Sequence, residues 1–313
     1  MHIEIIGAES LGVRGLCCLV VTPDRRVLVD PGVALGFVRN GHMPHPVQVA
    51  MGRTVRARII AALETATDIV FSHFHGDHIP LLEANPYQLA FRDLPPEICS
   101  KRAWCPSPEG QSTVMGARYK DLASLFGPNL RIADDSEHGD IIFSPPVPHG
   151  EPDGRQGSIM MTRVQSRSQA FVHASDIQLL NDQAVDRIID WRPNTVLAAG
   201  PPLYLERLDR ETRNRAWRNA ARLLENIPTV ILDHHLMRSA QGPAWLRSLS
   251  NRTGRHAYCA AEYMGRPPLL LEARREELYQ TMPVPEGWHD LYGAGQTDVR
   301  EFFFSFAEKE IRP

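Results

Sequence analysis

The chain of 313 residues lacks several features that would place it in a specialised class of protein. It has only five cysteines and no C-x-x-C pair, so the sequence indicates neither a disulfide scaffold nor a zinc site made of thiolates. The amino terminus is typical of a strand rather than a signal peptide, and the odd number of cysteines favours reduced thiols and a cytoplasmic location. No hydrophobic run approaches the length of a membrane span.

The chain also lacks an excess of charge of one sign, because its formal net charge is −3. We therefore expect no large basic surface for long nucleic acid or for an anionic membrane. Hydrophobic residues make up 43% of the chain and charged residues 23%, as in an ordinary globular protein with a substantial core. The partners that remain are a small molecule or a short anionic oligomer.

Strand and helix signals alternate along the chain without a linker or a repeat, which predicts one domain over residues 1–313. A β-rich start followed by more strands and then βα units indicates two central sheets with helices outside. Strands are predicted at 2–6, 16–21, 26–29, 67–71, 130–133, 140–144, 158–164, 169–174, 195–199 and 229–232, and helices at 54–65, 179–189, 211–225, 244–249 and 273–279.

Three stretches have no clear period. Residues 36–53 contain scattered glycines and prolines, and we interpret them as an irregular segment that could act as a lid. Residues 79–128 are broken by prolines, and we expect helical pieces there whose positions the sequence does not give. Residues 280–313 form a carboxyl-terminal extension of unassigned role.

Residues 72–79, SHFHGDHI, hold four potential metal ligands within six positions: His73, His75, Asp77 and His78. They follow a predicted strand, whose alternation places His73 and His75 on the same side. A lone histidine is more often a packing residue than a ligand. Neutral imidazoles that crowd together need an acceptor for their lone pairs, however, and a divalent cation provides one. The stretch therefore predicts half of a metal site.

Other potential ligands follow later apolar runs, at positions where strands of an open α/β architecture would end and where such proteins place their sites. A polar residue commonly ends a strand, so each of these is weak alone, and the set gains weight beside the histidine cluster. The residues are Asp30, His149, Asp176, and the adjacent His234 and His235.

In this order, these residues resemble the motif series of the metallo-β-lactamase superfamily. Five longer segments are similar to one branch of it, a group of predicted metal-dependent hydrolases known mainly from archaeal genomes. They are ESLGVR (9–14), DPGVALG (30–36), HASDIQLLN (173–181), GPPLYL (200–205) and DHH (233–235). The resemblance extends to about residue 275 and implies an αββα sandwich. Gly76 and Ile79 depart from the branch, which carries a bulky residue and a histidine at these positions.

The resemblance also implies a ligand set for two divalent metal ions. The first ion would be bound by His73, His75 and His149, the second by Asp77, His78 and His234, and Asp176 would bridge them. Asp30 would orient the histidine loop from behind. His235 remains an alternative to His234, which we prefer because Arg238 follows it by four residues, as in the H-x-x-x-R of ribonuclease Z. Nitrogen and oxygen ligands suit Zn²⁺, and Mn²⁺ or Fe²⁺ would also fit them.

Such a site implies a hydrolase that uses a metal-bridging hydroxide, with Asp77 and Asp176 passing the proton. A guanidinium at Arg238 would favour a phosphodiester substrate, and an ester, thioester, lactone or amide stays open. The di-iron reductases of the superfamily form another class, but they carry a carboxylate where this chain has His75. A non-catalytic metal-binding protein is the remaining alternative.

Overall fold

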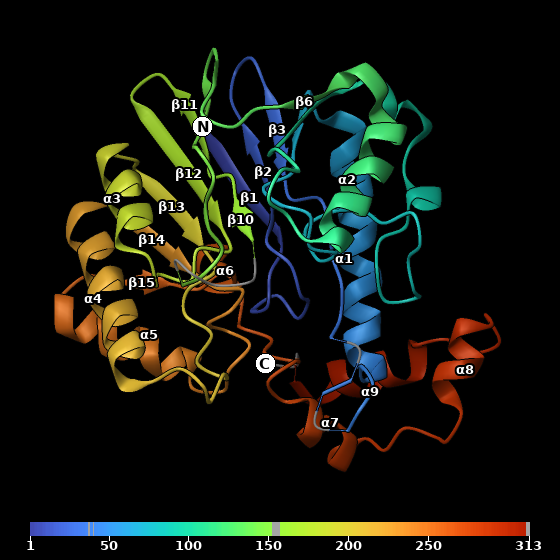
Figure 1. Cartoon of the computed structure of the whole chain (residues 1–313). Helices are drawn as coiled ribbons and strands as arrows, with labels where there is room; N and C mark the ends of the chain where they lie inside the picture. The colour runs from blue at the N-terminus through green and yellow to red at the C-terminus, as the bar shows by residue number, and fades with distance from the viewer. Residues whose placement is uncertain (37, 40, 152–156, 311–313) are drawn as a thin grey trace.

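The computed structural model describes residues 1–36, 38–39, 41–151 and 157–310. Two β-sheets pack face to face, and helices cover the outer face of each sheet (Figure 1). The layers run helix, sheet, sheet, helix, which confirms the predicted αββα sandwich.

The first sheet comes from the amino-terminal half of the chain and has the strand order β1–β2–β3–β4–β5–β6. Its first three strands are antiparallel, and the strands from β3 to β6 are parallel. The bounds are β1 (His2–Gly7), β2 (Cys17–Val21), β3 (Arg26–Val29), β4 (Asp68–Val70), β5 (Arg102–Cys105) and β6 (Leu130–Ile132).

The second sheet has the order β15–β14–β13–β12–β11–β8–β7, with parallel pairing from β12 to β15 and antiparallel pairing from β7 to β12. A short pair, β9 (Val147–Pro148) and β10 (Ser158–Ile159), lies beside it. The sheet comprises β7 (Glu137–His138), β8 (Ile141–Phe143), β11 (Thr162–Ser166), β12 (Gln169–Ser175), β13 (Thr195–Ala198), β14 (Thr229–Leu232) and β15 (Ala257–Tyr258).

The alternation of side chains along the strands builds the layers. In β3, Val27 and Val29 point into the core between the sheets, whereas Leu28 points to the outer core beneath the helices. Burial of each such aliphatic side chain contributes roughly 1.5–3 kcal/mol to the free energy of folding. The first sheet is covered by α1 (Pro46–Thr65) and α2 (Thr113–Phe126), and the second by α3 (Asp182–Asp190), α4 (Arg210–Asn226) and α5 (Gly242–Thr253).

The start of α1 differs from the sequence prediction. The helix begins at Pro46 and not near residue 54, so residues 46–53 of the predicted irregular segment are helical. His45 caps the helix, because its Nδ1 accepts the N–H of Val47 at 3.3 Å and its own N–H donates to Oε1 of Gln48 at 3.0 Å. Residues 37 and 40 of the predicted lid lie outside the described residues.

Two further predictions need correction. The strand expected at 158–164 is divided, because its first residues pair with β9 and its later ones form β11. The stretch 79–128 contains a strand, β5, besides the expected helical pieces. Those pieces are η1 (Phe91–Asp93), η2 (Pro96–Ser100) and α2, with η3 (Gly127–Asn129) following α2.

The carboxyl-terminal extension packs below the lower end of α1 in Figure 1. It contains the end of α7 (Arg275–Thr281) together with α8 (Trp288–Gly293) and α9 (Arg300–Glu310), and the short α6 (Ala260–Tyr263) precedes it. Trp288 and Val299 share a small core with Leu35 and Val49, so the extension rests on the start of α1 and on the segment before it. None of the helices in the described ranges combines the length and apolarity needed to cross a membrane.

Candidate metal centre

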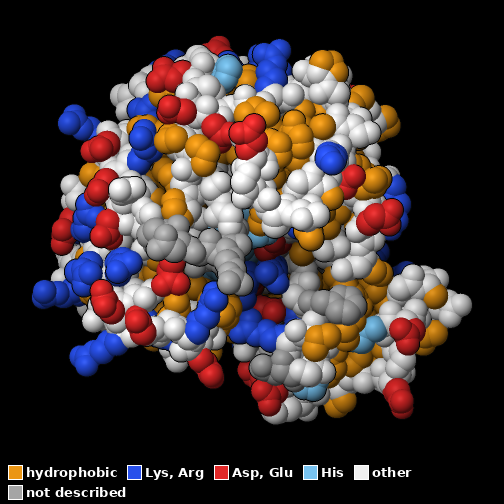
Figure 2. Space-filling model, in the orientation of Figure 1, with side chains coloured by type: hydrophobic (Ala, Val, Ile, Leu, Met, Phe, Trp, Pro, Cys, Tyr) orange, Lys and Arg blue, Asp and Glu red, His pale blue; other side chains and the backbone are white. Residues whose placement is uncertain are grey.

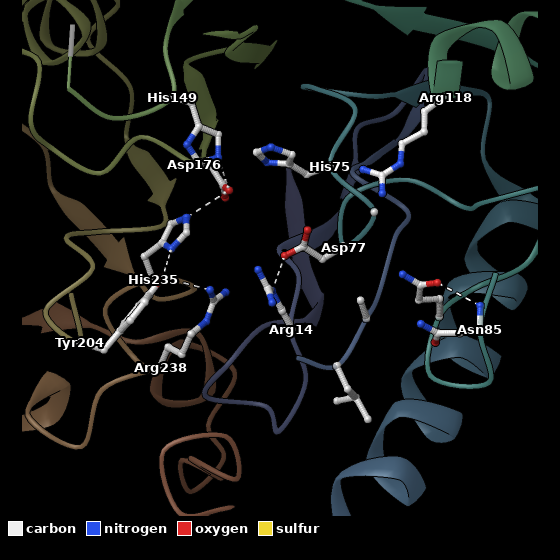
Figure 3. A pocket seen from close by; sticks show the side chains of 14 residues that line it. Arg14, His75, Asp77, Asn85, Arg118, His149, Asp176, Tyr204, His235 and Arg238 are labelled. Atoms are coloured by element: carbon white, nitrogen blue, oxygen red, sulfur yellow. Dashed lines mark hydrogen bonds and ion pairs between the residues drawn. The ribbon is translucent and has the colours of Figure 1, made fainter. Parts of the chain in front are cut away.

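The predicted ligands converge at one edge of the sandwich. Asp30 follows β3, the 73–78 loop follows β4, Asp176 follows β12, and His234 and His235 follow β14 by one residue. Because β3 and β4 are parallel to each other, as are β12, β13 and β14, their carboxyl ends meet at the same edge. His149 arrives from the end of β9. The structure thus brings together every residue that the sequence predicts for the centre, and Figure 3 shows the part that lines a pocket.

Asp176 lies at the middle of this cluster and is buried. Its two carboxylate oxygens face two different groups of imidazole nitrogens. Oδ2 lies near Nε2 of His149 (2.8 Å), His235 (3.1 Å) and His73 (3.6 Å). Oδ1 lies near Nε2 of His78 (3.3 Å) and His234 (3.7 Å). One carboxylate therefore serves two potential cation sites.

Each group is compact enough to hold an ion. One ligand atom from each of His73, His75, His149 and Asp176 lies within 4.8 Å of all the others, and the same holds for Asp77, His78 and His234. Nε2 of His73 is only 2.9 Å from Nδ1 of His75.

Two unsatisfied atoms in the cluster indicate that metal ions would fit these residues. Nε2 of His78 and Oδ1 of Asp176 are both buried, and neither has a hydrogen-bond partner within the described residues. An unsatisfied buried polar group costs about 1–3 kcal/mol, so two of them facing each other need an explanation. A cation between them would satisfy both, and the residues present therefore fit two divalent ions.

Asp30 holds the centre from behind. Its fully buried carboxylate accepts hydrogen bonds from the backbone N–H of Ser72 (2.7 Å), from the hydroxyls of Ser72 and Ser175 (2.7 Å each) and from Nδ1 of His78 (2.9 Å). The last bond leaves Nε2 of His78 to face Asp176. Asp30 (φ 50°) and Ser175 (φ 44°) both adopt the left-handed region, a strained conformation for such residues, at the point where the two sheets are tied together.

His234 and His235 occupy different positions. Nε2 of His234 lies 3.4 Å from Oδ2 of Asp77, within the second group, whereas His235 lies beside the first group. The hydrogen bonds at the Nδ1 atoms of the two rings favour the opposite assignment. Nδ1 of His234 accepts the N–H of Gly15 at 3.3 Å, and Nη2 of Arg238 lies 3.2 Å from its Nε2, so donors face both ring nitrogens of His234. The Tyr204 hydroxyl, 3.0 Å from Nδ1 of His235, can leave Nε2 of His235 free. Position favours His234 as the late ligand, and hydrogen bonding favours His235.

The electrostatics favour neutral imidazoles beside charged carboxylates. Burial, aided by neighbouring imidazoles, lowers the pKa of His75 to about 4 and holds the pKa of His73 well below its usual value. Burial alone would raise the pKa of Asp77, but the Arg14 guanidinium, together with His234 and His78, outweighs burial and keeps that pKa well below its usual range. Neutral histidines and ionised aspartates are the forms that bind metal ions.

His78 is the exception. Burial alone would lower its pKa, but the carboxylates of Asp176 and Asp30 outweigh burial and raise the pKa well above its usual value. A cation bound there must displace this proton.

A cavity of about 480 Å³ opens onto the centre. Figure 2 shows basic side chains in the hollow at the middle of this face. The pocket lining includes three arginines, Arg14, Arg118 and Arg238, and no carboxylate among the described lining residues other than Asp77 and Asp176. The sequence does not predict Arg14 or Arg118 as pocket residues, because neither lies in a segment with a recognisable ligand spacing.

Arg238 is buried and largely engaged by the protein itself. Its Nε donates to Oε1 of Glu9 at 2.7 Å and its Nη1 to the Tyr204 hydroxyl at 3.0 Å. Its Nη2 lies 3.2 Å from Nε2 of His234, so each nitrogen of the guanidinium faces a group of the protein. Arg14 is more accessible, with its side chain 36% exposed and its Nε donating to Oδ2 of Asp77 at 2.9 Å.

Three histidines that are not among the predicted ligands have other contacts. Nε2 of His173 lies 2.8 Å from the Leu16 carbonyl. The His42 ring stacks on Tyr279 of α7, and Nε2 of His45 lies 2.9 Å from the Met282 carbonyl, so His45 contacts the carboxyl-terminal extension and His42 contacts the helix that leads into it. Arg39 is the residue of the predicted lid segment that reaches the pocket wall, with its guanidinium 5.3 Å from the centre of the Tyr204 ring.

Comparison with known proteins gives the family. No protein-family model matches the chain. It is 46% identical over 302 residues to a UPF0282 protein of Methanosarcina mazei, covering 96% of this chain and 99% of the relative. The chain belongs to the UPF0282 family. Another family member, from Pyrococcus furiosus, is 32% identical over 292 residues and covers 90% of this chain and 92% of its own. The predicted archaeal branch is confirmed.

Solved structures resemble the UPF0282 chain more distantly. A metal-dependent hydrolase of the β-lactamase superfamily is 13% identical with a TM-score of 0.49, covering 82% of this chain and 94% of its own. The zinc-bound PqqB of Methylobacterium extorquens is 11% identical with a TM-score of 0.44, covering 83% and 98%. Likenesses at this level add nothing to the layer and strand order described above, which is that of the metallo-β-lactamase fold.

Proposed function

We propose that this UPF0282 protein is a dinuclear metal-dependent hydrolase that acts on a small anionic molecule. One observation carries the proposal: the buried Asp176 carboxylate turns one oxygen to each of two histidine groups, and its Oδ1 and Nε2 of His78 are unsatisfied within the described residues. A structural cluster of buried polar groups would satisfy these atoms with hydrogen bonds.

The ligand assignment follows the two groups. His73, His75 and His149 would hold the first ion with Oδ2 of Asp176, and Asp77, His78 and His234 would hold the second with Oδ1 of Asp176. Zn²⁺ suits these ligands best, with Mn²⁺ and Fe²⁺ as alternatives. When bound, such a pair of ions lowers the pKa of a shared water toward neutrality and polarises the bond to be cleaved.

The protein's own groups would bind the substrate and move protons. Asp77 lines the pocket, and its Oδ2 is held by Arg14, so Asp77 is the carboxylate best placed to take up a proton beside the substrate. Arg14 presents the accessible guanidinium next to the centre and takes over the role that we predicted for Arg238. A guanidinium there favours a phosphodiester. Carboxyl esters, thioesters, lactones and amides remain alternatives.

The test joins metal content to turnover. Protein purified without chelators should contain about two equivalents of a divalent metal, measured by elemental analysis. A panel of chromogenic phosphodiester, phosphomonoester, thioester, lactone and β-lactam substrates is then assayed with added Zn²⁺ and Mn²⁺. We expect phosphodiester turnover that Asp77→Ala abolishes and that Asp24→Asn, at an exposed position, leaves unchanged.

The outcomes separate the parts of the proposal. Turnover of carboxyl substrates alone would keep the hydrolase and remove the phosphodiester preference. Protein that neither contains metal nor takes up Zn²⁺ or Mn²⁺ would end the proposal. Fully metallated protein without turnover on any substrate would favour a non-catalytic metal-binding role.

A further inference from the structure

The pocket has a second polar wall that does not belong to the metal centre. In Figure 3, Arg118 and Asn85 lie across the cavity from His149, His235 and Tyr204. Arg118 comes from α2, and Asn85 comes from the loop between the 73–78 motif and η1, which also supplies Gln88 to the pocket lining. None of these three residues belongs to a predicted metal ligand set.

The two amides of this wall are oriented by the backbone. Oε1 of Gln88 accepts the N–H of Asn85 at 3.0 Å, and Oδ1 of Asn85 accepts the N–H of Tyr87 at 2.9 Å. Each side chain thus uses its carbonyl oxygen within the loop and keeps its NH₂ group as a donor. Within the described residues, neither NH₂ group has a hydrogen-bond acceptor. The loop therefore presents two donors whose position is fixed in advance.

Arg118 adds a positive charge to this wall. Its Nη1 donates to the Phe74 carbonyl at 3.0 Å, which holds the half-buried guanidinium at the edge of the pocket. Gly76 leaves room for it, because a Cβ atom at that position would lie 3.4 Å from Nη2 of Arg118 and 3.1 Å from Leu81. A larger side chain at residue 76 would compete for the space that Arg118 occupies.

The carboxyl-terminal extension supports the loop from behind. The Tyr87 hydroxyl lies 2.9 Å from Nδ1 of His289, and the Tyr279 hydroxyl lies 3.0 Å from Nε2 of the same ring. Tyr87 also stacks on Tyr292 with ring planes 7° apart. Donors held in place before a ligand arrives bind it with a smaller loss of entropy. This support gives the extension a role in the pocket.

We propose that Arg118, Asn85 and Gln88 form a second oxyanion-binding subsite, so that the substrate carries a carboxylate or phosphate group apart from the bond that is cleaved. The inference rests on the proposed function, because that function places the cleaved bond at the metal centre. A guanidinium with two fixed amide donors, and no acidic residue on this wall among the residues that the structure describes, matches the acceptor oxygens of such a group.

Binding of phosphonates tests the subsite without turnover, because their carbon–phosphorus bond is not hydrolysed. Calorimetry on the zinc-loaded protein compares 3-phosphonopropionate and 5-phosphonopentanoate with propylphosphonate and pentylphosphonate, which lack the carboxylate. We expect at least one of the two carboxylates to bind about 10-fold tighter than its matched alkylphosphonate. Arg118→Gln and the double variant Asn85→Ala/Gln88→Ala should remove this gain and leave alkylphosphonate affinity within about 2-fold.

Controls keep the test specific. Arg92→Gln removes a guanidinium that is 74% exposed and off the pocket, and it should keep the gain. Gly76→Leu should lose the gain while keeping its zinc, since it displaces Arg118 and no ligand. Metallated protein that binds alkylphosphonates but shows no gain, or a gain that survives both subsite variants, would overturn the subsite and leave the hydrolase proposal standing. Protein that takes up no zinc would overturn both.

Discussion

The two halves of the molecule supply the candidate centre in different ways. The amino-terminal half provides four potential ligands within one loop after β4, at residues 73–78. The second sheet and the short strand β9 beside it provide single residues from the ends of separate strands: His149, Asp176 and one histidine after β14. Local spacing defines the first set, whereas only the pairing and direction of the strands of the second sheet bring the other residues together.

The halves also differ in how they are secured. The amino-terminal loop is held by Asp30, whose carboxylate binds the loop backbone, His78 and, across the interface, Ser175. The carboxyl-terminal residues meet at Asp176, which faces both histidine groups. A substitution at either aspartate is therefore expected to change metal binding by residues of both halves.

The largest effect is expected at Asp176. Asn in its place has one carbonyl oxygen and no charge, so it cannot serve both groups, and we expect Asp176→Asn to lose both ions. His75→Ala should lose mainly the first ion and His78→Ala mainly the second. Elemental analysis of each variant, with folding checked by circular dichroism, measures the difference. Retention of one full equivalent in Asp176→Asn would show that this carboxylate belongs to a single site.

A smaller effect on metal affinity is expected at His234 and His235, and it shows which of them binds the second ion. We expect His234→Ala to lower the affinity for the second ion by 100-fold or more, and His235→Ala to cost about 10-fold or less. Zinc titration against a competing chelator measures both, with the exposed His256→Ala as the control. The reverse order would assign the ligand to His235, as the Tyr204 hydrogen bond favours.

The next smaller effect on metal affinity is expected at Asp30, because it acts on the ions only through His78 and the loop. Asp30→Asn replaces one acceptor oxygen with a donor, so the bond from His78 or one from a serine is lost. Outer partners of this kind typically change metal affinity by 10–100-fold. The same titration, with Asp24→Asn as the control, should show the larger loss at the second ion. Unchanged affinity in a folded variant would contradict the orienting role.

Much of the fold could be predicted from local patterns, and the failures have identifiable causes. Most strands of both sheets carry β-branched runs, and the predicted ranges agree with the structure within a few residues except at 158–164, whereas the two-residue strands β7 and β15 were not predicted. The start of α1 was missed because His45 caps it, and histidine is not a typical cap. β5 was missed because Arg102–Cys105 is short and follows a stretch broken by prolines.

The residues of the site also divide into those that could be predicted from the sequence and those that could not. The predicted ligands lie in one cluster, because strand ends gather at one edge of an α/β architecture. Arg14, Arg118, Asn85 and Gln88 could not be predicted, because their place in the pocket depends on loops and on helix packing rather than on spacing along the chain. Arg238 was recognised for its position near His234, but Glu9, which binds it, is 229 residues away in sequence.

The smallest effect on metal binding is expected at Arg238, whose contribution should be to stability. Arg238→Met leaves the buried Glu9 carboxylate without its partner, and breaking a buried ion pair in this way costs about 3–5 kcal/mol. The double variant Glu9→Gln/Arg238→Met removes both charges and should recover part of that cost. Urea unfolding of the zinc-loaded proteins measures both. Zinc affinity should fall by no more than about 10-fold, the lower end of the range for groups that contact a ligand, because Nη2 of Arg238 lies 3.2 Å from Nε2 of His234. Turnover of the double variant then separates the two roles. If it recovers stability and keeps turnover, Arg238 is a structural residue. If it recovers stability and loses turnover, Arg238 binds the substrate as the sequence first indicated.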